Sequence, residues 1–161
     1  MASQAKGAPQ KSGIIGWPVS HSRSPLLHTY WMQKHNIQAS YERCPVNPAD
    51  DFRAALEAMA QDGFVGANVT IPHKETAFAA MDSRTEAAQK LGAVNTIVMR
   101  EGRLLGANTD GEGFIASLEA GAADPDWRQK PALVLGAGGA ARAILAALEQ
   151  AGVGDIRLVN R

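Results

Sequence analysis

The sequence is poor in several features that would point to particular classes of protein. It has a single cysteine, Cys44, which excludes an intramolecular disulfide framework and argues against a cysteine-based metal cluster. Basic and acidic residues number 16 each, so no net field draws the chain to nucleic acid or to a membrane. No apolar run is long enough to span a bilayer, and the polar residues 1–12 lack the apolar core of a secretory signal. We therefore expect a cytoplasmic protein whose partner is a small molecule.

The composition and the residue patterns favour a soluble α/β protein. Of the 161 residues, 45% are hydrophobic and 16 are glycine, and strand-like and helix-like segments alternate along the chain. We expect a disordered tail (1–12), a first α/β domain (13–109), a connecting helix and linker (110–130) and the beginning of a second α/β domain (131–161). Expected strands are 13–17, 39–46, 65–71, 94–99, 103–107, 132–135 and 156–159, and the clearest helices are 24–36, 84–90, 111–121 and 140–151.

The segment Asn68–Glu75 carries the strongest signal for acid/base chemistry. An alternating apolar pattern ends there at Pro72, which suits the first position of a helix. Lys74 then lies in the first turn, near the positive end of the helix dipole, where a charged ammonium is disfavoured. Lys74 is thus either a lysine that exchanges a proton or a solvated surface lysine. We expect the neighbouring His73 at the surface.

Polar residues at the ends of the expected strands suggest a site for a hydroxylated ligand. Ser22 and Ser24 precede a helix and form a natural cradle for a carboxylate or phosphate, although Ser24 alone also reads as a simple helix cap. Asp110 likewise begins a helix, so it is either a cap or a site residue. Thr70 and Asn95 add neutral donors and acceptors at strand ends, where open α/β sheets bind their ligands.

A glycine-rich turn predicts dinucleotide binding. Residues 136–141 fit G-x-G-x-x-A directly after a strand and at the start of a helix, which lets backbone N–H groups approach a pyrophosphate. The next strand ends in Asn160 and Arg161, where an NAD site usually has an acid. Arg161 therefore favours a cofactor with a 2′-phosphate, which is NADP. The alternative is that Arg161 is only a solvated arginine at the end of the strand.

Five sequence blocks together resemble shikimate dehydrogenase. They are Ser22-Arg-Ser24-Pro25, Asn68-Val-Thr-Ile-Pro-His-Lys74-Glu, Gly92-Ala-Val-Asn95-Thr, Gly106-Ala-Asn-Thr-Asp110-Gly and Gly136-Ala-Gly-Gly-Ala140. The resemblance covers residues 13–161 and implies an N-terminal substrate-binding domain followed by the beginning of a Rossmann-type NADP-binding domain. It implies NADP-linked interconversion of shikimate and 3-dehydroshikimate, with a second copy of the chain, in a homodimer, as a further candidate partner.

The resemblance also assigns roles to individual residues. Lys74 exchanges the proton, with Asp110 as its hydrogen-bonded partner. The substrate carboxylate falls to Ser22 and Ser24, and the ring hydroxyls to Thr70, Asn95 and Asp110. The cofactor falls to Gly136, Ala137, Gly138, Gly139, Ala140, Asn160 and Arg161, with Glu86 nearby.

The chain ends after only two strands of a nucleotide fold that needs more. We therefore expect a fragment that is inactive by itself. Two alternatives remain open: a quinate/shikimate dehydrogenase that uses NAD, and a non-catalytic module that binds a metabolite of the same pathway. A folate-linked dehydrogenase of similar plan does not require the paired serines. No metal site is expected, since only His28 and His35 of the spaced histidines His21, His28 and His35 share the predicted helix, and two turns separate them.

Overall fold

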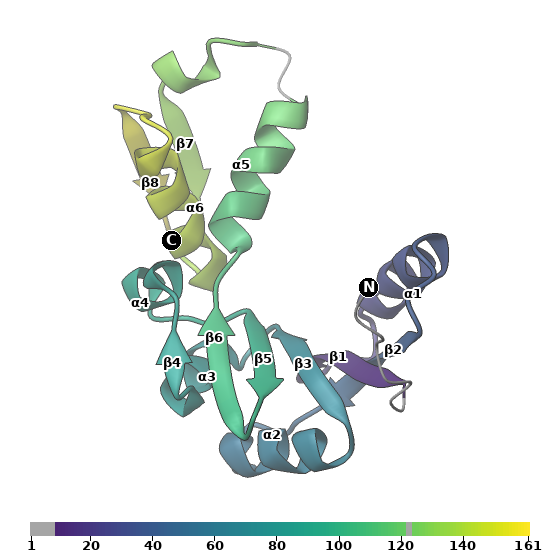
Figure 1. Ribbon diagram of the computed structural model, residues 1–161. Coiled ribbons are helices and arrows are strands. Elements are labelled where there is room, and N and C mark those ends of the chain that lie inside the picture. Colours follow the sequence, from purple (N-terminus) through teal and green to yellow (C-terminus); the bar gives the residue numbers. More distant parts are fainter. Residues whose placement is uncertain (1–8, 122–123) are drawn as a thin grey trace. The chain divides into compact units, whose positions relative to one another are not determined.

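The computed structural model describes residues 9–121 and 124–161 (Figure 1). The chain divides into two compact units, one ending at Ala107 and the other beginning at Asn108. None of the helices in the described ranges combines the length and the apolar character that a membrane span requires.

The first unit is built on a mixed sheet flanked by helices. Its strands are β1 (Gln10–Gly16), β2 (Ala39–Pro45), β3 (Phe64–Val69), β4 (Ser83–Arg84), β5 (Thr96–Arg100) and β6 (Arg103–Ala107), hydrogen-bonded in the order β2-β1-β3-β5-β6-β4. Its helices are α1 (Ser24–Lys34), α2 (Phe52–Gln61), α3 (Lys74–Ala80) and α4 (Glu86–Leu91). β1 runs parallel to both β2 and β3, whereas β3 and β5 are antiparallel. The α/β class expected from the sequence is confirmed.

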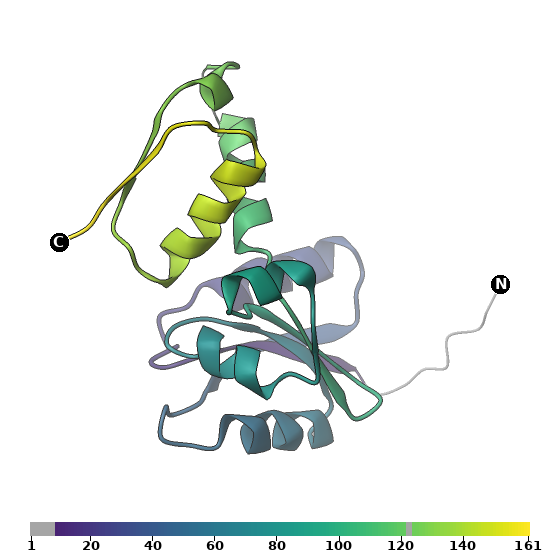
Figure 2. The same ribbon diagram turned by 90° about the vertical axis from the view of Figure 1, so that its left-hand side faces the viewer.

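Two hydrophobic clusters lie on opposite faces of this sheet. Successive side chains of a strand point to opposite faces, so Ile14 and Ile15 of β1 enter different clusters. Ile15 joins the larger cluster with residues of α2, α3 and α4, and α2 and α3 lie side by side (Figure 2). Ile14 joins Tyr41 and Met32 of α1 in the smaller cluster. The helices therefore cover both faces and leave the strand ends for function.

The beginnings of two elements differ from the sequence-based expectation. β1 begins at Gln10 because residues 10–12 pair in parallel with β2, a backbone contact that their polar side chains do not reveal. Part of the expected tail is therefore strand, while residues 1–8 lie outside the described part. At α1 the carbonyl of Arg23 accepts from the N–H groups of Leu26 and Leu27 (3.0 and 3.3 Å). Ser24 is thus the first helical residue and not the cap.

Two further helix starts differ for local reasons. Pro72 precedes α3 and is not its first residue, because it lies in a turn closed by the His73 N–H and the Thr70 carbonyl (3.0 Å). α4 begins at Glu86, capped by the Thr85 hydroxyl, because residues 83–84 pair with β6 instead of continuing a helix. The hairpin of β5 and β6 is confirmed, and its turn residues Glu101 and Gly102 both have positive φ (53° and 72°).

The second unit contains a strand–helix–strand motif and one preceding helix. β7 (Ala132–Leu135) and β8 (Ile156–Val159) are parallel and are connected through α6 (Gly139–Gln150), as the sequence predicts. α5 (Asp110–Gly121) packs on α6, and a Cβ at Gly111 would lie 3.1 Å from Cβ of Ala147. A short 3-10 helix, η1 (Trp127–Gln129), precedes β7. Residues 122–123 of the expected linker lie outside the described part, and the expected domain limits stay a prediction.

The close pairing of β3 and β5 makes Gly66 intolerant of a side chain. A Cβ at Gly66 would lie 2.5 Å from the backbone oxygen of Ile97, so Gly66→Ala should lower the free energy of unfolding by about 1–3 kcal/mol. The control is Gly113→Ala in α5, where a Cβ meets no atom within 4 Å. There alanine should stabilise the chain by about 0.5–1 kcal/mol, because glycine weakens a helix interior. Urea unfolding measures both changes, and an unchanged midpoint for Gly66→Ala would contradict the packing.

Candidate functional site

The loops that follow β1 and β3 are joined by backbone hydrogen bonds. These strands are parallel neighbours, so their carboxyl ends lie at one edge of the sheet. The Thr70 N–H donates to the Ile15 carbonyl (2.8 Å), and the Trp17 N–H donates to the Ile71 carbonyl (3.1 Å). A Cβ at Gly16 would lie 2.6 Å from Cγ2 of Thr70, so glycine is needed for this approach. The loop after β1 that carries Ser22 and Ser24 (the serine loop) and the segment after β3 that carries Lys74 (the lysine segment) therefore start from the same edge of the sheet.

The two serines lie at the start of α1 and are partly buried. The Ser24 N–H donates to Oγ of Ser22 (3.3 Å), which fixes the two residues relative to each other. The guanidinium of Arg43, in β2, donates to the Ser22 carbonyl through Nε and Nη2 (3.1 and 2.6 Å). Sequence reasoning missed Arg43, because only the parallel pairing of β1 and β2 brings it to this loop. Two hydroxyls beside a cation suit an anionic ligand.

Tyr41 connects the serine loop to β3, and sequence reasoning missed it as well. Its side chain is buried, its ring stacks on His28 with the ring centroids 3.9 Å apart, and its hydroxyl donates to Oδ1 of Asn68 (2.7 Å). Burial raises the pKa of Tyr41 to about 12, the nearby Cys44 adds to the rise, and a hydrogen bond with the Ser24 side chain opposes it. Its signal in the sequence is a lone aromatic residue between polar neighbours in a strand.

Backbone contacts bring Asn95 and Lys74 to this edge of the sheet. The Asn95 carbonyl accepts from the Val69 N–H (2.8 Å), at the end of β3. The Lys74 carbonyl accepts from the Val94 N–H (2.9 Å), so the backbone of Lys74 is bonded to the residue next to Asn95. Asn95 is buried and Lys74 is half-buried. The first unit thus brings Ser22, Ser24, Thr70, Lys74 and Asn95 to loops of one sheet edge.

His73 is buried, so the expectation of a surface histidine is wrong. Its Nε2 lies 2.7 Å from the Val46 carbonyl, and its ring centroid lies 5.2 Å from that of Phe52. Because a carbonyl can only accept, Nε2 carries the proton. His73 therefore fastens the start of α3, and with it Lys74, to the loop after β2.

Two further predicted site residues belong to other elements. Asp110 is the first residue of α5 in the second unit, where its N–H donates to Oδ1 of Asn108 (3.0 Å). Its pairing with Lys74 would join the two units and stays a prediction. Glu86 of α4 forms an exposed ion pair with Lys90 (2.9 Å). Its role near a cofactor also stays a prediction.

The glycine turn of the second unit has the form that a phosphate site needs. Gly136 has a φ of 98°, which favours glycine, and its N–H donates to the Val159 carbonyl (2.7 Å). The Ala137 N–H donates to Oδ1 of Asn160 (3.1 Å), so Asn160 closes the turn. Gly138 caps α6 without a side-chain bond, and a Cβ there would meet no atom within 4 Å. The start of α6 is thus open to an anionic group, as a pyrophosphate requires.

Comparison with known proteins identifies the family. The model of the shikimate dehydrogenase substrate binding domain matches residues 14–97, just over half of the chain. The chain belongs to the shikimate dehydrogenase family. Among its curated relatives, the NADP(+) shikimate dehydrogenase of Mesorhizobium japonicum is 52% identical over 157 residues, which are 96% of this chain and 54% of that protein. The corresponding protein of Rhodospirillum rubrum is also 52% identical, over 96% of this chain and 55% of its own length.

Solved structures agree with this assignment to the shikimate dehydrogenase family. A Thermus thermophilus shikimate dehydrogenase in complex with NADP(H) and shikimate superposes with a TM-score of 0.85 at 40% identity, over 94% of this chain and 56% of that one. The Aquifex aeolicus enzyme gives a TM-score of 0.87 at 37% identity, over 95% and 56%. The chain spans about half the length of the curated relatives it matches.

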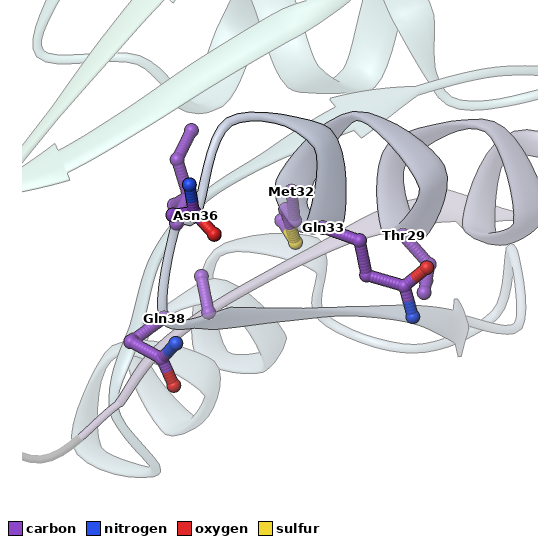
Figure 3. Close-up of a pocket in the computed structure, with 7 residues that line it drawn as sticks. Thr29, Met32, Gln33, Asn36 and Gln38 are labelled. Atoms are coloured by element: carbon purple, nitrogen blue, oxygen red, sulfur yellow. The ribbon is translucent and has the colours of Figure 1, made fainter.

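A hollow on the first unit lies away from the residues that match the shikimate dehydrogenase motifs. It has a volume of about 400 Å³ and lies between the end of α1 and the start of β2 (Figure 3). Its lining residues are Thr29, Met32, Gln33, Asn36, Ile37, Gln38 and Ala39. Ala39 pairs with Gln10 at the amino ends of β2 and β1, whereas the serine and lysine loops follow carboxyl ends. The hollow is therefore not the site described above.

Tyr41 should make stability depend on pH in the alkaline range. Its pKa is raised from 10.0 to about 12 on folding, so the unfolded chain loses this proton first and stability falls as pH rises from about 10 to 12. Tyr41→Phe should flatten that fall. Tyr30→Phe is the matched control, because Tyr30 is exposed. Urea unfolding at several pH values measures the slopes, and equal slopes for Tyr41→Phe and the parent would contradict the assignment.

Proposed function

We propose that this chain supplies the substrate-binding part of an NADP-dependent shikimate dehydrogenase, which interconverts shikimate and 3-dehydroshikimate. The observation that carries the proposal is the shared sheet edge. It joins the loop of Ser22 and Ser24 to the segment of Thr70 and Lys74, and both segments match the family pattern. A relative from Thermus thermophilus that superposes on the chain is in complex with both NADP(H) and shikimate.

The proposed roles follow from the chemistry of each group. The hydroxyls of Ser22 and Ser24 donate to the substrate carboxylate, with Arg43 adding positive charge at the same loop. Thr70, Asn95 and Asp110 bind the ring hydroxyls. Because the two serines, Thr70 and Asn95 lie on loops of one edge of the sheet, they would hold the ring in one orientation, which lowers the entropic cost of reaction.

Lys74 is the proposed proton exchanger. Oxidation of the alcohol transfers a hydride from carbon and a proton from oxygen, and bound NADP⁺ would take the hydride. The neutral amine of Lys74 takes the proton and becomes an ammonium, which returns it in the reverse reaction. Asp110 is the proposed partner that stabilises this ammonium. His73 holds the segment in place through its hydrogen bond to Val46.

The cofactor would bind in the second unit. Gly136 to Ala140 form the glycine turn at the start of α6, and the resemblance to the family favours a pyrophosphate there. Asn160 and Arg161 follow β8, where a 2′-phosphate would lie. Glu86 is the remaining candidate for a residue near the cofactor. The proposal also includes a cytoplasmic location and a homodimer. The particle mass in solution would test the homodimer.

Turnover tests the role of Lys74. Because the chain spans about half of its relatives, the assay uses a chimera in which the remainder of the Mesorhizobium japonicum relative follows Arg161. Lys74→Ala should lower the rate of shikimate oxidation by about two to four orders of magnitude, as loss of a general base does, and change shikimate affinity much less. Lys34→Ala, at the exposed end of α1, is the control. Near-parental turnover by Lys74→Ala would contradict the assignment.

The same chimera separates the alternatives. NADP-linked oxidation of shikimate in preference to quinate supports the proposal. Preference for NAD with quinate would instead indicate the quinate/shikimate enzyme, and shikimate binding without turnover would indicate a binding module.

Arg161 should set the preference for NADP. Removing a charged hydrogen bond costs about 1.5–3 kcal/mol, so Arg161→Ala should weaken NADP binding by roughly 10- to 150-fold while leaving NAD binding unchanged. Arg157→Ala is the control, because Arg157 is exposed on β8 and pairs with Asp155 (2.9 Å). Titration of both cofactors measures the ratio, and an equal loss for NADP and NAD would refute the role of Arg161.

A further inference from the structure

Four side chains form a chain of hydrogen bonds across β2, β3 and β5. The Tyr41 hydroxyl contacts Oδ1 of Asn68 (2.7 Å), and Nδ2 of Asn68 lies 3.4 Å from Oγ1 of Thr96. Oγ1 of Thr96 in turn lies 2.9 Å from Oδ1 of Asn95. Tyr41 and Asn95 are buried, while Asn68 and Thr96 are half-buried. We call these four residues the Tyr41–Asn95 relay.

A backbone carbonyl fixes the direction of the relay. Nδ2 of Asn68 also lies 3.5 Å from the Asn95 backbone oxygen, a long contact with a group that can only accept. The amide nitrogen of Asn68 must therefore face Asn95 and Thr96, and its oxygen must face Tyr41. Because that oxygen accepts, the Tyr41 hydroxyl has to donate.

The same accounting applies to the last step. The hydroxyl of Thr96 accepts from Asn68 and has one proton left, which it donates to Oδ1 of Asn95. The side-chain amide of Asn95 is thereby held with its oxygen toward Thr96 and its amino group turned away from it. With the Asn95 amide reversed, Oγ1 of Thr96 would accept from both amides, and its own proton would need another acceptor.

We propose that Tyr41 and Thr96 are positioning residues, which hold the Asn95 amide so that it presents a hydrogen-bond donor to a ring oxygen of the substrate. This inference rests on the proposed function, in which Asn95 binds a ring hydroxyl of shikimate. A donor suits that task because it can bond to an alcohol oxygen and equally to a ketone oxygen, so the contact survives whichever of the two the ring carries. Neither Tyr41 nor Thr96 needs to touch the substrate.

Calorimetric titration of the 161-residue chain with shikimate tests the relay. Thr96→Val keeps the shape of the side chain and removes the hydroxyl, and Tyr41→Phe removes the phenol oxygen. Each should raise the Kd for shikimate by about 3- to 10-fold, the effect of one lost uncharged hydrogen bond. Thr96→Ser keeps the hydroxyl and should retain most of the parental affinity. Thr29→Val and Tyr30→Phe, both at exposed positions of α1, are the matched controls and should bind as the parent does.

The double variant distinguishes a relay from two independent effects. If the hydrogen bonds act as one chain, Tyr41→Phe combined with Thr96→Val should bind little worse than either single variant. In the chimera with the Mesorhizobium japonicum remainder, the same variants should raise KM and leave kcat within about twofold, since the proton exchanger is untouched. A general structural defect would instead lower the shikimate affinity of Thr96→Ser as much as that of Thr96→Val.

Two results overturn the inference, and they differ in what else they overturn. The relay alone is refuted if the parent chain binds shikimate and Thr96→Val binds it equally well. It is also refuted if the losses of affinity of the two single variants multiply in the double variant. A parent chain that is folded and does not bind shikimate refutes the proposed function and the inference with it.

Discussion

The backbone carbonyl of Asn95 is the point on which the candidate site depends. It accepts the Val69 N–H at the end of β3, and Nδ2 of Asn68 faces it from the same strand. The next residue back, Val94, donates to the Lys74 carbonyl. One short segment before β5 therefore fixes the end of β3, the side chain of Asn68 and the start of α3. Because these bonds are made by buried or half-buried groups, breaking one leaves a polar group without compensation, which costs more than the bond itself contributes.

The arrangement of the sheet explains why the site can be both rigid and accessible. Helices cover the two faces, so the strand ends remain for the loops. β1 and β3 are parallel and adjacent, which brings two loops that are far apart in sequence to one edge. Gly16 allows those loops to approach, and Tyr41 of β2 links the serine loop to β3 across β1. Polar groups that are held by such a scaffold lose little freedom when a ligand binds.

Much of this could be predicted from the sequence. The sequence predicts the limits of β8, the hairpin of β5 and β6 and the family motifs, because local alternation, turn residues and motif spacing determine them. The first residues of helices were harder to predict. Ser24 has the composition of a cap, yet the Arg23 carbonyl already accepts helical hydrogen bonds. His73 is buried by contacts with Val46 and Phe52, residues far from it in sequence.

The residues that sequence reasoning missed share one property. Tyr41 and Arg43 lie on β2 and act only through strands and loops that the fold brings beside them. No local pattern marks such residues, since their partners Asn68 and Ser22 are set by strand pairing. Predicting them needs the order and direction of the strands as well as their positions.

The most direct test of the account is a map of the amide signals that shift when shikimate is titrated into the 161-residue chain, followed by nuclear magnetic resonance. If shikimate binds at the shared edge of β1 and β3, the amides of Ser24, Thr70, Lys74 and Asn95 should shift together and saturate with one Kd. Shifts confined to the hollow around Gln33 and Asn36, or no shifts in a folded chain, would contradict it.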